Sequence, residues 1–194
     1  MRLSKNTAAL VLVLLTAAGA GLVAGQAAPQ KEEFRGKLVT GDFDPLHTIS
    51  SLVTIVVDHY TTDTQRSELT AAFNAGGTQA FYDALRKQPK VGYFRMPDSI
   101  GYDLRCAIQH IQPDGGRILF LASDRPVGFG ERYEQSRSLN YPFTVIELRL
   151  DKNGRGEGTI APEARIIVSE DGQFFDVENF GPFPVIVKTI HKVK

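Results

Sequence analysis

The residues with the clearest potential for chemistry lie in one long polar segment, 123–140. Its candidate ligand-binding side chains are two acids, two arginines and a tyrosine: Asp124, Arg125, Glu131, Arg132 and Tyr133. Guanidinium groups match the geometry of carboxylates and phosphates. Long connections in compact domains are often functional. We therefore predict that this segment binds a small anionic ligand or a protein partner. Local ion pairs within the segment, with Glu131 and Glu134 as acids, are the alternative explanation.

The sequence assigns no catalytic residue. A serine hydrolase of the nucleophile-elbow type needs a Gly-x-Ser-x-Gly run, and the chain has none. His59 follows Asp58, but alternation along a strand places the two side chains on opposite faces. The alternative is a hydrolase or isomerase whose acid and base come together from separate strands. The residues available for such a site are His59, His110, Asp124 and Glu131.

No metal or cofactor is predicted. The four histidines show no spacing typical of zinc ligands. The segment 151–157 begins like a calcium loop, but Arg155 stands where an oxygen ligand belongs and Pro162 where the bidentate glutamate is required. Gly128 and Gly130 lack the third glycine of a nucleotide-binding loop. These segments are better explained as turns.

The first residues have the pattern of a secretory signal peptide, assigned to residues 1–28 and followed by a flexible leader at 29–33. Arg2 and Lys5 are followed by an uncharged apolar stretch and then by small residues, which favours cleavage after Ala27 or Ala28. An earlier cut after Ala20 also fits, and a retained membrane anchor is the alternative. We expect a periplasmic or secreted protein with no transmembrane span after cleavage.

Charge and cysteine content narrow the possible partners. The chain has 22 basic and 22 acidic side chains, so nucleic acid is not an expected partner. Cys106 is the single cysteine, so no internal disulfide can form. Its alternation with Leu104 and Ile108 predicts a buried, unreactive thiol on the core face.

Residues 34–194 form a single β-rich domain according to the hydrophobic pattern. Tight-turn residues at 114–116, 153–154 and 171–172 separate apolar runs and predict antiparallel hairpins. One helical insertion, 62–88, follows the second strand, and Gly76 with Gly77 is expected to divide it into two helices. The predicted class is α+β, mostly antiparallel β: a sandwich or partly open barrel with a two-helix insertion.

The function expected from these features is binding in an exported or envelope-associated protein, more plausibly without catalysis. Its support is a polar segment suited to ligands and a near-neutral charge. Two rivals remain: the hydrolase or isomerase described above, and a purely structural envelope component.

Overall fold

The computed structural model describes residues 10–12, 31–40, 49–97, 99–127, 141–168, 175–179 and 185–193. The helix and strands in these ranges are β1 (Leu10–Leu12), β2 (Glu32–Thr40), β3 (Ile49–Val57), α1 (Asp63–Leu85), β4 (Gly92–Arg95), β5 (Tyr102–Ile111), β6 (Arg117–Ser123), β7 (Phe143–Leu150), β8 (Arg155–Val168), β9 (Phe175–Asn179) and β10 (Val185–Lys192).

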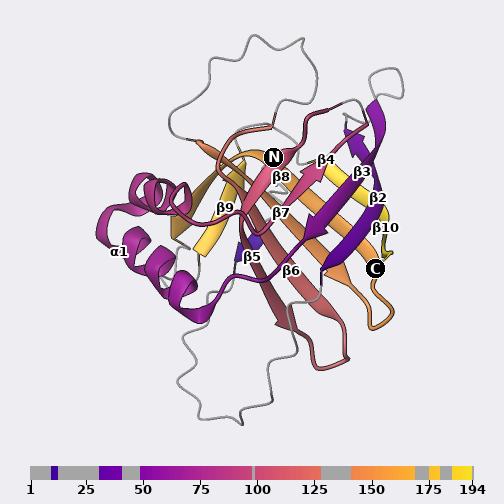
Figure 1. Cartoon of the computed structure of the whole chain (residues 1–194), viewed down its shortest axis with the longest axis horizontal. Coiled ribbons are helices and arrows are strands. Elements are labelled where there is room, and N and C mark those ends of the chain that lie inside the picture. Colours follow the sequence, from indigo (N-terminus) through magenta and orange to yellow (C-terminus); the bar gives the residue numbers. More distant parts are fainter. Residues whose placement is uncertain are drawn as a thin grey trace, which may run out of the picture.

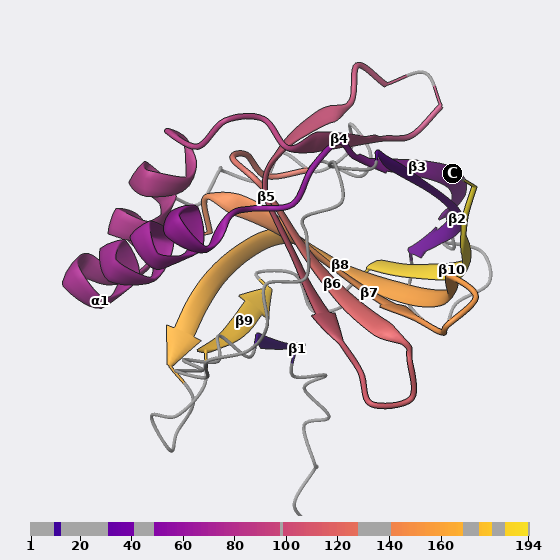
Figure 2. The same ribbon diagram turned by 60° about the horizontal axis from the view of Figure 1, so that its bottom comes forward.

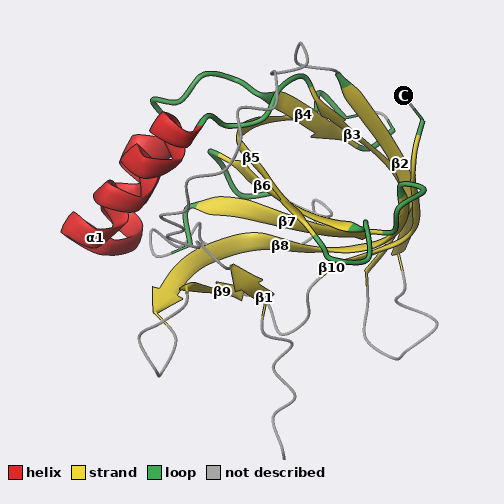
Figure 3. Cartoon of the chain, turned by 90° about the horizontal axis from the view of Figure 1, so that it is seen from below, coloured by secondary structure: helices red, strands yellow, loops and turns green. Residues whose placement is uncertain are grey.

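Eight of these strands close into an antiparallel barrel, which Figure 3 shows from below. The ring runs β8-β10-β2-β3-β4-β5-β6-β7 and returns to β8 through the β7–β8 pairing. β8 has 14 residues and pairs with different strands along its length: its first half pairs with β10 and its second half with β9. Figure 2 shows β8 curving away from the barrel toward β9, whose other edge pairs with β1.

The prediction of a sandwich or partly open barrel is therefore wrong, although the antiparallel β character is confirmed. The hairpins β5–β6 and β7–β8 are local and were visible in the turn residues. Closure depends on β10, which pairs with β8 on one side and with β2 on the other. That second pairing joins segments far apart in sequence, and no local pattern encodes it.

The helical region is one element, α1, and the prediction of a two-helix insertion is wrong. Thr62 caps its first turn, with the Gln65 side chain completing the capping box. At Gly76 and Gly77 the backbone leaves helical angles and α1 kinks, with Gly77 at φ 64°. α1 lies against the outer side of the barrel (Figure 1).

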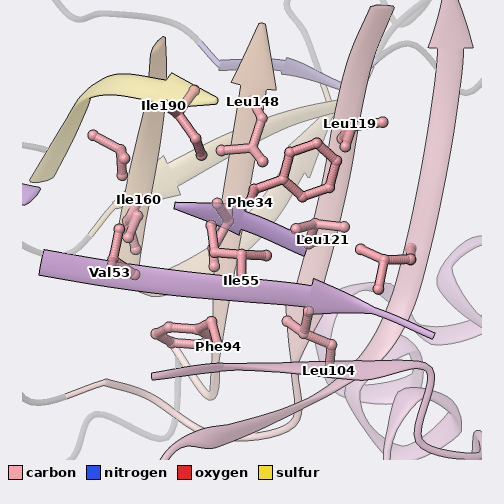
Figure 4. Packing of buried hydrophobic residues seen from close by; sticks show 14 of the residues in the cluster. Phe34, Val53, Ile55, Phe94, Leu104, Leu119, Leu121, Leu148, Ile160 and Ile190 are labelled. Atoms are coloured by element: carbon pink, nitrogen blue, oxygen red, sulfur yellow. The ribbon is translucent and has the colours of Figure 1, made fainter. Parts of the chain in front are cut away.

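Two apolar cores stabilise this arrangement. The first fills the barrel interior with side chains that include Phe34, Ile55, Leu121 and Leu148, drawn in Figure 4. An eight-stranded barrel has room for such a filling or for one small ligand. The second core lies between α1 and the outer side of the barrel, and Leu69, Phe73, Phe81 and Leu85 are its helical members.

Two of the three predicted hairpin turns are confirmed. Gly115 and Gly154 adopt positive φ, 84° and 72°, in the turns that join β5 to β6 and β7 to β8. The third, at 171–172, lies outside the described residues, as does all of the predicted signal peptide except β1. In the described part of the chain, no helix is both long enough and apolar enough to cross a bilayer.

Candidate ligand site at the mouth of the barrel

The end of the barrel where β6 finishes and β7 begins forms the candidate site; we call it the mouth. Here Thr144 ties three segments together, because its hydroxyl oxygen lies 3.0 Å from the carbonyl oxygen of Arg125 and 2.7 Å from that of Pro162. The single hydroxyl proton is shared between these two acceptors. The amide of Val127 also donates to the Pro162 carbonyl at 3.0 Å. Residues 124–127 are thus anchored onto β8.

Two of the predicted site residues lie at the mouth, but both are already engaged. Asp124 accepts a hydrogen bond from Nε of Arg105 at 2.9 Å. The Arg125 guanidinium lies 4.6 Å from the ring centroid of Tyr102 and donates to the carbonyl of Gly101 at 2.6 Å. Neither Arg105 nor Arg125 is therefore an unoccupied anion receptor.

The remaining predicted site residues are Glu131, Arg132 and Tyr133, which lie outside the described residues. The structure describes only the first residues of the predicted segment, 123–127, and its role in binding stays a prediction. Within that range it brings Asp124 and Arg125 to the mouth, next to β5, β7 and β8.

The mouth also holds two buried oxygen atoms that have no hydrogen-bond partner among the described residues: Oγ of Ser123 and Oε2 of Glu163. Ser123 is 0% exposed and pairs in register with Leu104 and Thr144. Glu163 directly follows Pro162, the residue that anchors the 124–127 segment. Most buried polar atoms in proteins are paired, so two orphans at one end of a barrel require a physical explanation.

Sequence reasoning missed Ser123 and Glu163. For Ser123 a signal existed, since Leu119, Leu121 and Ser123 occupy alternate positions of one strand and the first two fill the barrel core. A hydroxyl in line with two core leucines predicts a buried polar group. For Glu163 no comparable signal exists, because a register shift separates the β7–β8 pairs on either side of it.

A third orphan oxygen, Oε2 of Glu147, lies elsewhere. Glu147 pairs in register with Phe120 and Thr159, and Phe120 lines a cavity beneath α1. Burial raises the pKa of Glu147, although an ion pair with Arg149 opposes the shift. One oxygen of this carboxylate pairs with Arg149 and the other has no partner among the described residues, and the group lies away from the mouth.

The opposite end of the barrel carries a buried polar cluster whose hydrogen bonds are complete; we call it the Glu32 cluster. The Glu32 carboxylate accepts from Tyr60 Oη at 2.5 Å, from an Arg117 amino group at 2.9 Å and from Lys192 Nζ at 2.6 Å. Arg117 also lies over the ring of Phe34, 5.6 Å from its centroid. These contacts join β2, β6, β10 and the segment after β3.

The protonation equilibria follow from these contacts. Burial alone would raise the pKa of Glu32, but the hydrogen bonds from Arg117, Lys192 and Tyr60 outweigh it and place that pKa below its ordinary value. Burial and the Glu32 carboxylate together raise the pKa of the Tyr60 phenol. The cluster is thus an ionised carboxylate held by three donors.

The thiol of Cys106 is buried, as predicted, but in the second core. A register shift between Leu104 and Cys106 moves Cys106 to the outer face, while Leu104 stays in the barrel interior. Burial raises the pKa of Cys106 to about 11. It lines an apolar cavity of about 40 Å³ beneath α1, much smaller than pockets of about 300 Å³ or more that hold whole ligands.

The residues considered for catalysis are not brought together in the described structure. Asp124 pairs with Arg105 at the mouth, whereas His59 follows β3 and His110 stands near the end of β5. Among the described residues no histidine ring is hydrogen-bonded to a carboxylate; His191 lies 3.4 Å from the carbonyl oxygen of Thr189. The same residues contain no group of histidine, cysteine and acidic side chains arranged to hold a metal ion.

A scan against protein-family models, a search of curated proteins and a search of solved structures found no match to this chain. The geometry of the barrel is therefore the basis for the function proposed next.

Proposed function

We propose that this protein is an exported binding protein that holds a small ligand at the mouth of the barrel through its hydroxyl or amino groups. The observation that carries the proposal is the pair of buried, unpaired oxygens, Ser123 Oγ and Glu163 Oε2. Both atoms can accept a hydrogen bond, and a carboxylate oxygen is the stronger acceptor. A ligand that donates to them would complete the hydrogen bonding of this end.

The two unpaired oxygens carry an energetic cost. A buried acceptor without a partner costs about 1–3 kcal/mol relative to the same group in water. A fold tolerates such a cost where function requires it, and the mouths of β-barrels are common sites for small molecules. Ligand binding recovers that cost, so the orphan atoms contribute to affinity.

The contacts at the mouth support a different class of ligand from the one that the sequence favours. The sequence favoured an anion, because arginines are frequent in segment 123–140. At the mouth, however, Arg105 and Arg125 are engaged within the protein, and the unpaired atom of Glu163 would repel an anion. A neutral polyol or sugar, or an amine, fits the available acceptors better.

Export is the second part of the proposal. It is supported by the charged, apolar and small-residue succession of residues 1–28. In the periplasm or outside the cell, a protein with one buried cysteine depends on its core for stability, as this barrel does. Detection of the processed chain in the exported fraction tests this part separately from ligand binding.

Ligand-observed NMR with a fixed set of probes tests the site. Spermidine, glucosamine and glucose represent donors, and citrate and phosphate represent anions. We expect binding of at least one donor probe, weakened about tenfold or more in Glu163→Gln or Ser123→Ala, since a charged or neutral hydrogen bond is lost. Glu157→Gln and Ser51→Ala, at exposed or half-exposed positions, are the matched controls.

Two results would overturn the proposal. One is binding of no donor probe by the wild-type protein. The other is equal binding by wild type, Glu163→Gln and Ser123→Ala, because the orphan atoms would then play no part in recognition.

A further inference from the structure

The outer surface of five neighbouring strands, β4, β3, β2, β10 and β8, carries basic side chains in two register rows. One row crosses all five strands: Arg95, Thr54, Arg35, His191 and Arg155. The next row places Leu52, Lys37 and Lys188 side by side. The basic members are all exposed, and we call them the cationic face: Arg35, Lys37, Arg95, Arg155, Lys188 and His191.

This arrangement opposes folding stability. Lys37 stands directly opposite Lys188, and His191 stands between Arg35 and Arg155. Like charges on directly opposite positions of neighbouring strands destabilise a sheet. Within the described residues Arg35 pairs with Glu33 at 2.7 Å and Arg155 interacts electrostatically with Asp151. Lys37 and Lys188 have no acidic partner there. Two lysines, Lys37 and Lys188, therefore remain available to an external anion.

Exposed aliphatic side chains share this surface. Leu52 is 66% exposed and pairs in register with Lys37. Ile186 is 42% exposed and stands two residues before Lys188 on β10. Single exposed aliphatic residues are ordinary, but here two of them flank unpaired lysines on one face.

We propose that the cationic face binds the surface of a bilayer that contains anionic phospholipids. Lysine and arginine gain free energy near such a surface, and aliphatic side chains gain by entering the boundary between headgroups and acyl chains. A sulfated polysaccharide or an acidic protein surface would satisfy the charges, but an anionic polymer offers no apolar layer to Leu52 and Ile186. The combination of charge and aliphatic exposure therefore favours the bilayer.

The shape of the molecule is compatible with this contact. β2, β3 and β10 lie on the side of the barrel away from α1 (Figures 1 and 3). Neighbouring strands are about 4.8 Å apart, so the row from β4 to β8 follows about 19 Å of the curved barrel wall, half of the ring. The contact with a flat bilayer therefore falls on its middle strands, β3, β2 and β10, which carry Leu52, Lys37, Lys188 and Ile186. This surface is separate from the mouth, and the inference does not depend on the proposed ligand site.

Vesicle sedimentation tests the proposal with the purified protein in the form that accumulates in cells. The probes are vesicles of phosphatidylcholine alone and with 30% phosphatidylglycerol, each at low and high salt. We expect binding only to the anionic vesicles, weakened by salt. Lys37→Gln/Lys188→Gln should weaken it about 30-fold, at about fivefold per lost cation. The matched control is Arg86→Gln/Lys87→Gln, at exposed positions at the end of α1.

The variant itself should fold, because it removes two like charges from opposite positions. Leu52→Ser is a second variant, which tests the aliphatic contact without changing the charge. It should weaken vesicle binding severalfold and leave binding to dextran sulfate unchanged. The proposal is overturned if wild type ignores anionic vesicles at low salt, or if the control variant weakens binding as much as the lysine variant. It is also overturned if dextran sulfate binds while Leu52→Ser has no effect on vesicles, which would assign the face to an anionic polymer.

Discussion

The two ends of the barrel differ in the hydrogen bonding of their buried polar groups. At one end the Glu32 carboxylate receives three donors, from Tyr60, Arg117 and Lys192. At the other end Ser123 Oγ and Glu163 Oε2 receive none. β6 connects the two ends, since Arg117 is its first residue and Ser123 its last.

The contrast in hydrogen bonding suggests different roles for the two ends of the barrel. A buried cluster with complete hydrogen bonds contributes to a unique fold. Removal of one partner leaves the remaining charges buried without compensation. An unpaired buried acceptor lowers stability, and under the proposed function a bound donor would recover that cost. We therefore expect mutations in the Glu32 cluster to reduce stability and mutations at the orphan oxygens to reduce binding.

The largest expected effect is that of Glu32→Ala. It leaves the Arg117 and Lys192 cations without their shared carboxylate in a site where Glu32 is only 6% exposed. Breaking a buried ion pair in this way costs about 3–5 kcal/mol of unfolding free energy. Urea denaturation measures the loss. Glu33→Ala, which breaks the more exposed pair with Arg35, should cost about 1 kcal/mol or less; equal losses would contradict the contrast.

Tyr60→Phe is expected to have the next largest effect. It removes the phenol hydroxyl that donates to Glu32 at 2.5 Å and leaves the ring in place. A hydrogen bond to a charged group is worth about 1.5–3 kcal/mol. Thermal unfolding should show the corresponding decrease. Tyr93→Phe is the matched control. If Tyr60→Phe were as stable as wild type, the hydrogen bond between Tyr60 and Glu32 would contribute nothing to the unfolding free energy.

Acid should lower the unfolding free energy through the protonation of Glu32. The folded-state pKa of Glu32 lies below its ordinary value of 4.5. The group therefore contributes stability above about pH 4.5, and that contribution is lost as the pH falls through the folded-state pKa. The slope reaches at most about 1.4 kcal/mol per pH unit. Urea unfolding between pH 3 and 7 measures it, and in Glu32→Gln this part of the slope should be absent.

The smallest effect is expected at Ser123, and Thr144 provides a matched comparison. The two residues pair in register, and each loses one hydroxyl in Ser123→Ala or Thr144→Val. Thr144→Val should cost about 1 kcal/mol or more, because the hydroxyl that links the Arg125 and Pro162 carbonyls is lost and Pro162 keeps only the Val127 amide as donor. Ser123→Ala should change the unfolding free energy by less than about 0.5 kcal/mol, or raise it. A larger loss in Ser123→Ala would show that its hydroxyl has a partner in solution.

Local features of the fold were predictable from the sequence. The alternating pattern, the turn glycines at 115 and 154, and the capping box of Thr62 and Gln65 each depend on neighbouring residues. The closed ring was not predictable, because β10 pairs with β2 across most of the chain. The kink at Gly76 and Gly77 also differs from the expected break, because positive φ at Gly77 bends α1 without a second capped start.

The candidate site was only partly predictable. Segment 123–127 lies at the mouth. The residue pattern of the sequence could not predict that Arg125 lies over Tyr102 or that Arg105 donates to Asp124. Such pairings depend on three-dimensional closure of β5 onto β6. Charge patterning also missed the cationic face, since its members come from four strands and only register brings Arg35, His191 and Arg155 into one row.

The pairing of β10 with β2 has a consequence for biogenesis. β2 leaves the ribosome early, whereas β10 is the last strand of the barrel to be made. The ring therefore cannot close while the chain is still being synthesised or threaded through a translocation channel, and non-local pairing of this kind is slow. Until residues 185–192 emerge, the edges of β2 and β8 that later pair with β10 remain open, so the chain carries two unpaired strand edges until its synthesis is nearly finished.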